Sequence, residues 1–449
     1  MTPLPTVTVP SPQPGLLRTW RVLLVLAWPV MLSRFGILLM ALTDVAMVGR
    51  VSTLEVGYLG LGNTIFLPVM ITCIGAMTGI IAVTAQAVGR GDSAGQAAAF
   101  RAGLLWGGVM GTLALLLTWN VGYVLPLLGH APEMSEGGRA VARALSPGAL
   151  FQVLFVVCAF WLEGTGRSRP ALVAMIAANL VNVAGNALLI PMMQAEGAAH
   201  ATTLARATAF AIVAGVVLTR PEMRAALPRA PLPLRPIVAI GLAGGAAYFF
   251  ETFAFAALGN MAALIGPQAL AAYTIVHNLE AAVFMVALGL SIAAAVQVGQ
   301  AAGAGDLARA RAIALAATAL TALILTSLTT LLVLFAEPVA RRFTDDALLI
   351  ARIGPLFAVL AVSLVFDGAQ VVLGQCVRAL GDAWATTLRY FAGFWCVMIP
   401  LGYLLGLRSG LEEMGLFIAT GCGCAVAAGL LWLRLDRLTR ERRLAHDAP

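Results

Sequence analysis

The chain has 449 residues, of which 60% are hydrophobic and only 11% are charged, and its mean hydropathy is +0.92. Soluble domains carry about 25% charged residues, so this composition excludes a soluble protein and indicates an integral membrane protein. The net charge of +7 comes from arginine, since the chain has no lysine. Most of the arginines lie between apolar runs, where membrane topology explains them better than nucleic-acid binding does.

Apolar stretches predict an all-α membrane protein with twelve transmembrane helices, because a helix needs about 20 residues to cross a bilayer. They lie at 22–48, 57–87, 101–125, 145–163, 170–193, 198–219, 237–260, 269–299, 310–336, 350–377, 384–407 and 412–434. Residues 1–20 are rich in proline and threonine and lack the basic region and cleavage site of a signal peptide. We expect a disordered cytoplasmic tail at 1–20 and a second cytoplasmic tail at 436–449.

The distribution of arginines predicts the orientation. With the N-terminus inside, nineteen of the 28 arginines lie on the cytoplasmic side and seven on the outer side, while Arg34 and Arg206 lie within helices. Cytoplasmic loops are enriched in basic residues, so we predict that both termini lie in the cytoplasm. Arg34 is about 15 Å along its helix from Asp44. It either snorkels to the inner surface or pairs with another helix.

The sequence carries an internal duplication. Gln86 is followed by a Gly-x-Gly-Asp segment that ends at Asp92, and Gln300 is followed by one that ends at Asp306. The offset is 214 residues at each matched position. Neither segment has the Gly-Lys-Ser/Thr ending of a phosphate-binding loop, so both are expected to be tight turns. The chain therefore consists of two copies of one unit.

Each copy contains six predicted helices, an even number, so the two copies should be parallel repeats around a central cavity. We expect an N-terminal lobe at 21–219 and a C-terminal lobe at 237–435. Residues 220–236, with five prolines and four arginines, should form a cytoplasmic linker between them. Parallel halves suit a transporter that rocks between two conformations, although a duplicated bundle can also be purely architectural.

Three acidic residues lie inside long apolar runs: Asp44, Glu251 and Asp367. An ionisable group at membrane depth costs roughly 2.5 to 3.5 kcal/mol on insertion scales, and such groups are kept mainly where they handle ions, protons or substrate. These three residues are therefore the first candidates for the working site.

The same residues carry a family resemblance. Its landmarks are the Asp-x-x-x-x-Gly from Asp44 to Gly49, the phenylalanine pair before Glu251, and the segment DGAQVVLGQCVRALGD that begins at Asp367. Together they make the chain, over nearly its whole length, similar to the multidrug and toxic compound extrusion (MATE) family, NorM-like branch. The resemblance implies two lobes of six helices around a V-shaped cavity. It also implies efflux of cationic, amphiphilic compounds by alternating access, in exchange for Na+ or H+. A location in the bacterial inner membrane is implied as well.

In NorM-like members the coupling cation binds to acids in helices seven and ten of the C-terminal lobe, which correspond here to Glu251 and Asp367. The helix-one acid of the N-terminal lobe corresponds to Asp44. A carboxylate in a low-dielectric site either takes up a proton or binds a hard cation through its oxygens. Either event neutralises the group and releases an organic cation held by the same charge. No metal beyond Na+ at Glu251 and Asp367 is expected.

Further polar residues are candidates for the same site. Asn182 and Asn186 are four residues apart and share one helical face. They match helix-five asparagines of the family that face the helix-one acid, and the alternative is that they only bond neighbouring helices together. His277, Glu280 and Phe284 share another face. Phe284 fits the aromatic lining of the family's cavity.

Glu280 departs from the family pattern. We interpret it as a fourth cavity acid, and the alternative is a local hydrogen bond between Glu280 and His277 that only fixes the helix. The six cysteines fall in apolar segments, which favours small buried residues over disulfides or a metal site.

Other functions fit the sequence less well. The chain has no Walker motif, nucleophile elbow or metal-ligand spacing, so we expect neither an enzyme nor a cofactor. A lipid-linked oligosaccharide flippase of the same superfamily is the main alternative, and its cavity should be strongly cationic to hold pyrophosphate. A non-transporting scaffold and a channel are further alternatives. The expected partners are small organic cations and membrane lipids, with no nucleic acid, and the expected state is a monomer.

Overall fold

The computed structural model describes residues 15–225 and 231–447, and these residues are helical throughout, without a strand. The helices are α1 (Leu16–Gly49), α2 (Thr53–Ala76), α3 (Thr78–Gly89), α4 (Ser93–Trp119), α5 (Pro132–Gly164), α6 (Arg169–Leu218), α7 (Pro221–Ala225), α8 (Leu234–Ile265), α9 (Pro267–Gly303), α10 (Leu307–Leu334), α11 (Ala336–Ala340), α12 (Ala347–Ala379), α13 (Ala383–Phe391), α14 (Ile399–Gly402) and α15 (Glu412–Asp447). Two short π-helical segments, Ala392–Met398 and Tyr403–Arg408, follow α13 and α14 respectively. Together these four segments form one continuous helix over Ala383–Arg408. The predicted all-α membrane fold is confirmed.

Eleven helices in the described part are long and apolar enough to cross a membrane, one fewer than predicted. The difference lies in α6, whose 50 residues contain both predicted stretches 170–193 and 198–219. At Gln194 the backbone leaves helical geometry, with φ 54° and ψ −128°, and the chain reverses. Gly197 packs against the backbone of Leu189, and Gly185 packs against Ala201. α6 is therefore two antiparallel helices that supply both predicted spans.

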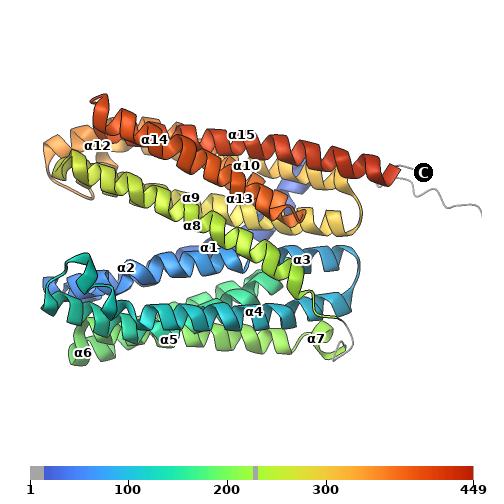
Figure 1. Cartoon of the computed structure of the whole chain (residues 1–449), viewed down its shortest axis with the longest axis horizontal. Helices are drawn as coiled ribbons and strands as arrows, with labels where there is room; N and C mark the ends of the chain where they lie inside the picture. Colours follow the sequence, from blue (N-terminus) through green and yellow to red (C-terminus); the bar gives the residue numbers. More distant parts are fainter. Residues whose placement is uncertain (1–14, 226–230, 448–449) are drawn as a thin grey trace, which may run out of the picture.

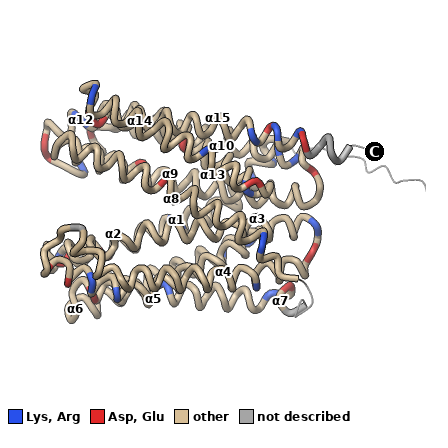
Figure 2. The backbone as a smooth tube through the Cα atoms, viewed as in Figure 1, with Lys and Arg blue, Asp and Glu red and all other residues tan. Residues whose placement is uncertain are grey.

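The helices form two bundles that lie side by side along the long axis of the molecule (Figure 1). We call α1 to α6 the N-terminal bundle and α8 to α15 the C-terminal bundle. α1 packs against both α6 and α9, and α2 packs against α8, so the bundles share a long contact. α7 and the last turns of α15 lie at the same end of the molecule, which we call the linker end (Figure 1). Charged residues gather toward the two ends of the helices, with few between them (Figure 2).

The chain ends and the linker differ in part from the sequence-based expectation. α1 begins at Leu16, inside the expected tail, because the Trp20 indole Nε1 donates to the Ala316 carbonyl at 2.9 Å and ties this turn to α10. α15 continues to Asp447, because Asp436 accepts from Arg311 and pairs with Arg440. Residues 1–14, 226–230 and 448–449, which belong to the expected tails and linker, lie outside the described residues.

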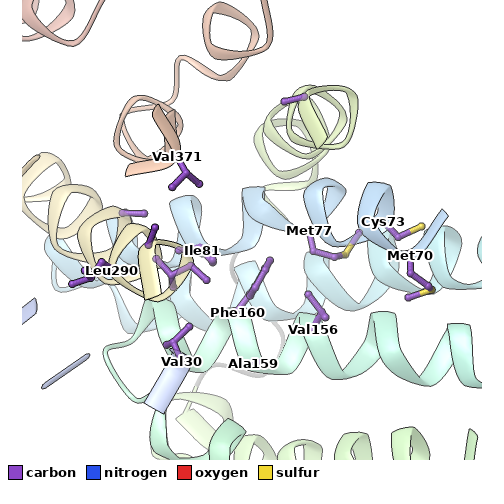
Figure 3. Packing of buried hydrophobic residues seen from close by; sticks show 14 of the residues in the cluster. Val30, Met70, Cys73, Met77, Ile81, Val156, Ala159, Phe160, Leu290 and Val371 are labelled. Carbon is purple, nitrogen blue, oxygen red and sulfur yellow. The ribbon is translucent and has the colours of Figure 1, made fainter. Parts of the chain in front are cut away.

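One apolar cluster joins the two bundles. Val30 of α1, Ile81 of α3 and Phe160 of α5 are buried with Leu290 of α9 and Val371 of α12 in a single hydrophobic core. Figure 3 shows these side chains around one packed region between ribbons of both halves. Burial of large apolar side chains stabilises such a contact by roughly 1.5 to 3 kcal/mol each in water. In the lipid-embedded part, close van der Waals packing takes over that role.

At the linker end the bundles are joined by two hydrogen bonds that are related by the sequence duplication. The Gln86 side-chain Nε2 of α3 donates to the Ala379 carbonyl of α12 at 2.8 Å. The Gln300 Nε2 of α9 donates to the Gly164 carbonyl of α5 at 3.4 Å. Each glutamine thus reaches from its own bundle to the end of a helix in the other bundle. The two bonds hold the linker end closed.

Glycine makes this close approach possible. A Cβ atom on Gly89 would lie 2.0 Å from the Gln300 carbonyl oxygen, and one on Gly303 would lie 2.2 Å from the Gln86 carbonyl oxygen. Both obstacles are backbone atoms, so a side chain at either position would push the helices apart.

Replacing Gly89 by valine is therefore expected to open the linker end, at a cost of about 1 to 3 kcal/mol for overpacking. Spin labels at Ala94→Cys and Ala308→Cys, in a background without other cysteines, would report the separation of the two turns. We expect a longer mean distance in Gly89→Val than in the glycine parent. Gly108→Val is the matched control, because a Cβ on Gly108 meets nothing within 4 Å. An unchanged distance in Gly89→Val would contradict the prediction.

Candidate functional site

A buried carboxylate stands at the centre of the N-terminal bundle. Asp44 of α1 accepts hydrogen bonds on Oδ1 from the Asn182 and Asn186 side-chain amides, at 2.9 and 2.7 Å. Its Oδ2 accepts from the Thr202 hydroxyl at 2.5 Å. Asp44 is 6% exposed, and its three partners are buried. The predicted grouping of Asp44 with the two asparagines is therefore present in the structure.

The fold of α6 brings these groups together. Asn182 and Asn186 lie before the chain reversal at Gln194, and Thr202 lies after it. The Asn182 amide also donates to the Thr202 hydroxyl at 3.0 Å, which fixes the two halves of α6 against each other. Thr202 was missed from the sequence, because its role depends on the reversal. Its spacing of four residues from Arg206, on one helical face, was the available signal.

Asp44 and Arg206 line a cavity of about 630 Å³. The guanidinium of Arg206 lies over the Phe66 ring, 4.6 Å from its centroid, and its Nη1 has no hydrogen-bond partner among the described residues. The lining is otherwise mostly apolar, with Asn63, Thr64 and Gln152 as further polar groups. The cavity thus offers one carboxylate and one arginine to a bound molecule.

The C-terminal bundle holds a second buried carboxylate. Asp367 of α12 accepts from the Gln370 side-chain amide at 3.0 Å and from the Cys424 thiol at 3.6 Å. Asp367 is 3% exposed and lies within electrostatic range of Glu251 and Glu280. Gln370 and Cys424 were missed as partners, although Gln370 lies three residues after Asp367 on the same helical face.

Glu251, Glu280 and Asp367 line one pocket of about 420 Å³, from α8, α9 and α12. Phe284 lines it as well, together with Phe255, Tyr273 and His277. The described lining contains no arginine, so this pocket is acidic and aromatic. It shares Ile71 and Thr252 with the larger cavity, which places the two hollows next to each other between the bundles.

The structure shows both the local contact between His277 and Glu280 and a place for Glu280 in the pocket lining. The His277 Nδ1 and the Glu280 Oε2 are 2.9 Å apart, which is the local contact. Glu280 is buried, and its other oxygen, Oε1, has no hydrogen-bond partner among the described residues. The His277 ring stacks between Phe255 and Tyr273, with centroid distances of 5.4 and 5.6 Å. Glu280 is therefore a lining acid that His277 also orients.

The chain is similar to known proteins over most of its length. The family model MatE matches residues 29–188 and 245–404, one segment in each bundle. A probable multidrug resistance protein NorM of Caulobacter vibrioides is 33% identical and covers 95% of this chain and 93% of its own. Another, from Bradyrhizobium diazoefficiens, is 30% identical with 93% of both chains covered. A solved Vibrio cholerae MATE transporter has a TM-score of 0.87 at 18% identity, covering 95% of this chain and 98% of its own.

The chain belongs to the MATE (MatE) family. MATE proteins are secondary transporters that use coupling ions, so this membrane protein is a transporter and not an enzyme. The resemblance to the NorM-like branch is confirmed by the names and coverage of these relatives. In this chain each bundle holds a buried carboxylate beside a hollow, with Asp44 at the 630 Å³ cavity and Asp367 at the acidic pocket.

Arg378 of this MATE chain is buried near a helix end. It is one of the nineteen arginines assigned to the cytoplasmic side, and it is 2% exposed in the last turn of α12. Its guanidinium lies over the rings of Tyr248 and Tyr390, at 5.6 and 5.3 Å, and within electrostatic range of Glu251. The close packing of the bundles at the linker end covers this position. Arg378 is thus a positive charge behind the acidic pocket.

A buried ion pair settles the question of Arg34. Its Nη2 donates to Glu163 Oε1 of α5 at 3.4 Å, and its guanidinium lies 5.2 Å from the centroid of the Phe160 ring. Of the two alternatives, pairing with another helix is correct. Glu163 was missed, although the duplication offered a signal. α5 and α12 both have 33 residues with an offset of 215, and this offset relates Glu163 to Arg378.

The cysteines follow the expected pattern only in part. Cys73, Cys158, Cys376 and Cys424 are buried and free, whereas Cys396 and Cys422 are exposed on the outer faces of their helices. An apolar thiol on such a face contacts lipid rather than water in a membrane, which explains why the apolar segments misled the burial prediction. Within the described residues, no group of three or more histidine, cysteine or acidic side chains has metal-site geometry.

Proposed function

We propose that this transporter exports cationic, amphiphilic compounds in exchange for Na+ or H+ by alternating access, as a multidrug efflux protein. The observation that carries the proposal is the pocket lined by Glu251, Glu280 and Asp367 without an arginine. Buried carboxylates attract cations strongly, because a low-dielectric environment screens charge weakly. The aromatic rings of Phe255 and Phe284 in the same lining suit the faces of organic cations. The multidrug resistance names of the relatives support the substrate class.

Competition for charge provides the coupling. Glu251 and Asp367 bind the coupling ion in the C-terminal lobe, and Asp44 serves the N-terminal lobe with Asn182 and Asn186 as polar support. A proton or Na+ that reaches these carboxylates from outside neutralises them and releases the organic cation. Repacking of the helices then exposes the site to the other side, where the ion leaves. Sodium prefers oxygen ligands, and both the carboxylates and the Gln370 side chain supply them.

The tight linker end supports a conformer that is closed on this side. With both termini in the cytoplasm of a bacterial cell, the closed side is the cytoplasmic one, and the cavity faces outward. We assign the lobes to 21–219 and 237–435, with the linker at 220–236. The working unit is a monomer in the inner membrane, and its partners are organic cations and lipids, with no nucleic acid. The flippase alternative requires a cationic cavity, which the acidic lining does not support.

Transport by the purified protein reconstituted into liposomes would test this function. Uptake of a fluorescent organic cation is measured under an imposed Na+ gradient, an imposed pH gradient, or neither. We expect accumulation under one of the two gradients, and the effective gradient names the coupling ion. Empty liposomes under the same gradients correct for passive distribution. Uptake that is the same with and without either gradient would overturn the antiport proposal and favour the flippase alternative.

Replacing Glu280 by glutamine is expected to weaken cation binding without abolishing coupling, since Glu251 and Asp367 remain. Losing a contact with one buried charged group costs about 1.5 kcal/mol, which is roughly a tenfold increase in the half-saturating cation concentration. The half-saturating concentration is measured from initial uptake rates at a series of cation concentrations. Glu337→Gln, an exposed carboxylate paired only with Arg341, is the matched control. An unchanged half-saturating concentration in Glu280→Gln would leave only the local role with His277.

A further inference from the structure

A basic crevice at the linker end is not used by the proposed transport cycle. It encloses about 560 Å³ between α1, α3 and α9 and the turn after α5. Arg18 and Arg21 of α1 provide its charge, and Gln297 and Gln300 of α9 face them across the two bundles. The rest of its lining is Val22, Val25, Leu26, Val88, Thr165 and Gly166.

The two arginines have no acidic partner among the described residues. None of the ion pairs formed between described residues involves Arg18 or Arg21, and no acidic residue lines the crevice. Residues 1–14, which precede α1, contain no aspartate or glutamate and cannot supply a carboxylate. An anion from outside the chain is therefore the ligand that would neutralise this pair.

The apolar surface beside the arginines indicates what kind of anion this is. Leu17 is 78% exposed, and Val22 and Val25 are 39% and 51% exposed on the same outer side of α1. The Trp20 indole anchors this turn on α10, so the arginines are held at a fixed position at the end of a membrane-spanning helix. A ligand with an anionic head and apolar chains matches both parts of this surface.

The duplication supplies an internal comparison. A second crevice lies at the equivalent place, where Gln86 corresponds to Gln300, and Pro236 and Ala239 correspond to Val22 and Val25, at the offset of 214. The position of Arg18 is taken there by Leu232, and that of Arg21 by Arg235, which does not line the second crevice. Arg90 is the one arginine in the described lining of the second crevice, whereas two arginines line the first.

We propose that the crevice formed by Arg18, Arg21, Gln297 and Gln300 binds the phosphate headgroup of an anionic phospholipid. The guanidinium groups bind phosphate oxygens through paired N–H donors, and the acyl chains lie along Val22 and Val25. Basic pockets between membrane helices on the cytoplasmic side are suited to such headgroups. This site is separate from the cavity acids, and its occupation does not depend on transport.

Lipid binding to the purified full chain tests the proposal. Native mass spectrometry after delipidation would compare phosphatidylglycerol with phosphatidylcholine of the same acyl chains, for wild type and for the Arg18→Gln/Arg21→Gln double variant. Each basic residue near an anionic lipid surface contributes about 1 kcal/mol of binding free energy. We therefore expect about 30-fold weaker phosphatidylglycerol binding in the double variant. Phosphatidylcholine binding should be equal and weak in both.

The control is Arg309→Gln/Arg437→Gln, which removes two exposed, unpaired arginines at the same end and should keep wild-type phosphatidylglycerol binding. If the glutamine variant does not fold, Arg18→Ala and Arg21→Ala are measured singly, and each should weaken binding about fivefold. Equal phosphatidylglycerol binding in wild type and variants would overturn the proposal. Inorganic phosphate that displaces the lipid at millimolar concentration would assign the crevice to free phosphate instead, and would also overturn it.

Discussion

Asp367→Asn is expected to abolish gradient-driven accumulation of organic cations in liposomes. Asparagine keeps the shape of the side chain and an oxygen for the Gln370 amide, but it neither takes up a proton at physiological pH nor carries the charge that binds Na+. One charge moved across about 100 mV corresponds to roughly 2.3 kcal/mol, or roughly fifty-fold accumulation. In the variant, the inside and outside concentrations should become equal.

The comparison needs a variant that loses a carboxylate elsewhere. Asp345→Asn removes an exposed acid near the start of α12, away from the pocket, and should accumulate the cation like wild type. Thermal unfolding of both variants would show that each is folded. Full accumulation by Asp367→Asn would remove Asp367 from the coupling scheme. Loss of accumulation in both variants would point to a general defect rather than to the pocket.

Asp44→Asn is expected to have the second large effect, on binding in the N-terminal bundle. Asp44 is the only acidic residue in the described lining of the 630 Å³ cavity, so its neutralisation leaves Arg206 as the one charge there. An organic cation then meets net repulsion in place of attraction. Interactions with a charged group are worth about 1.5 to 3 kcal/mol, so we expect cation affinity to fall by roughly tenfold or more.

Equilibrium binding of a fluorescent organic cation to the purified protein would measure this effect apart from coupling. The asparagine side chain still offers an oxygen to Asn182 and Asn186, so the fold should persist. Glu136→Gln, which removes an exposed acid paired only with Arg139, is the control. Affinity that survives in Asp44→Asn would confine substrate binding to the acidic pocket of the C-terminal bundle.

Sequence patterns predicted the groups whose chemistry is unusual for a membrane. A carboxylate in an apolar run is conspicuous by itself, and this made Asp44, Glu251 and Asp367 recognisable as candidates. The asparagine pair was visible from its helical spacing. By contrast, Thr202 and Gln370 are ordinary polar residues in the sequence, and only the packing of helices makes them partners of an acid.

The features that the sequence did not reveal have a common physical origin. The burial of Arg378 was not visible, because it lies near a helix end and the two bundles pack over that end. Glu163 was passed over because it lies at the end of its apolar run, and its partner Arg34 comes from a different helix. Periodicity describes one helix at a time, and these contacts involve two. The reversal at Gln194 is similar, since it changes no periodic pattern.

The paired glutamine bonds at the linker end have a consequence for how this molecule came to have two unlike cavities. Because each half contacts the other with the same surface, the contact has the form of an isologous dimer interface, as two identical subunits would make it. When the two halves are joined in one chain, a substitution in one half is no longer repeated in the other. At the offset of 215 that relates α5 to α12, Gln152 lines the larger cavity where Asp367 lines the acidic pocket. A homodimer would have to carry the same residue at both places.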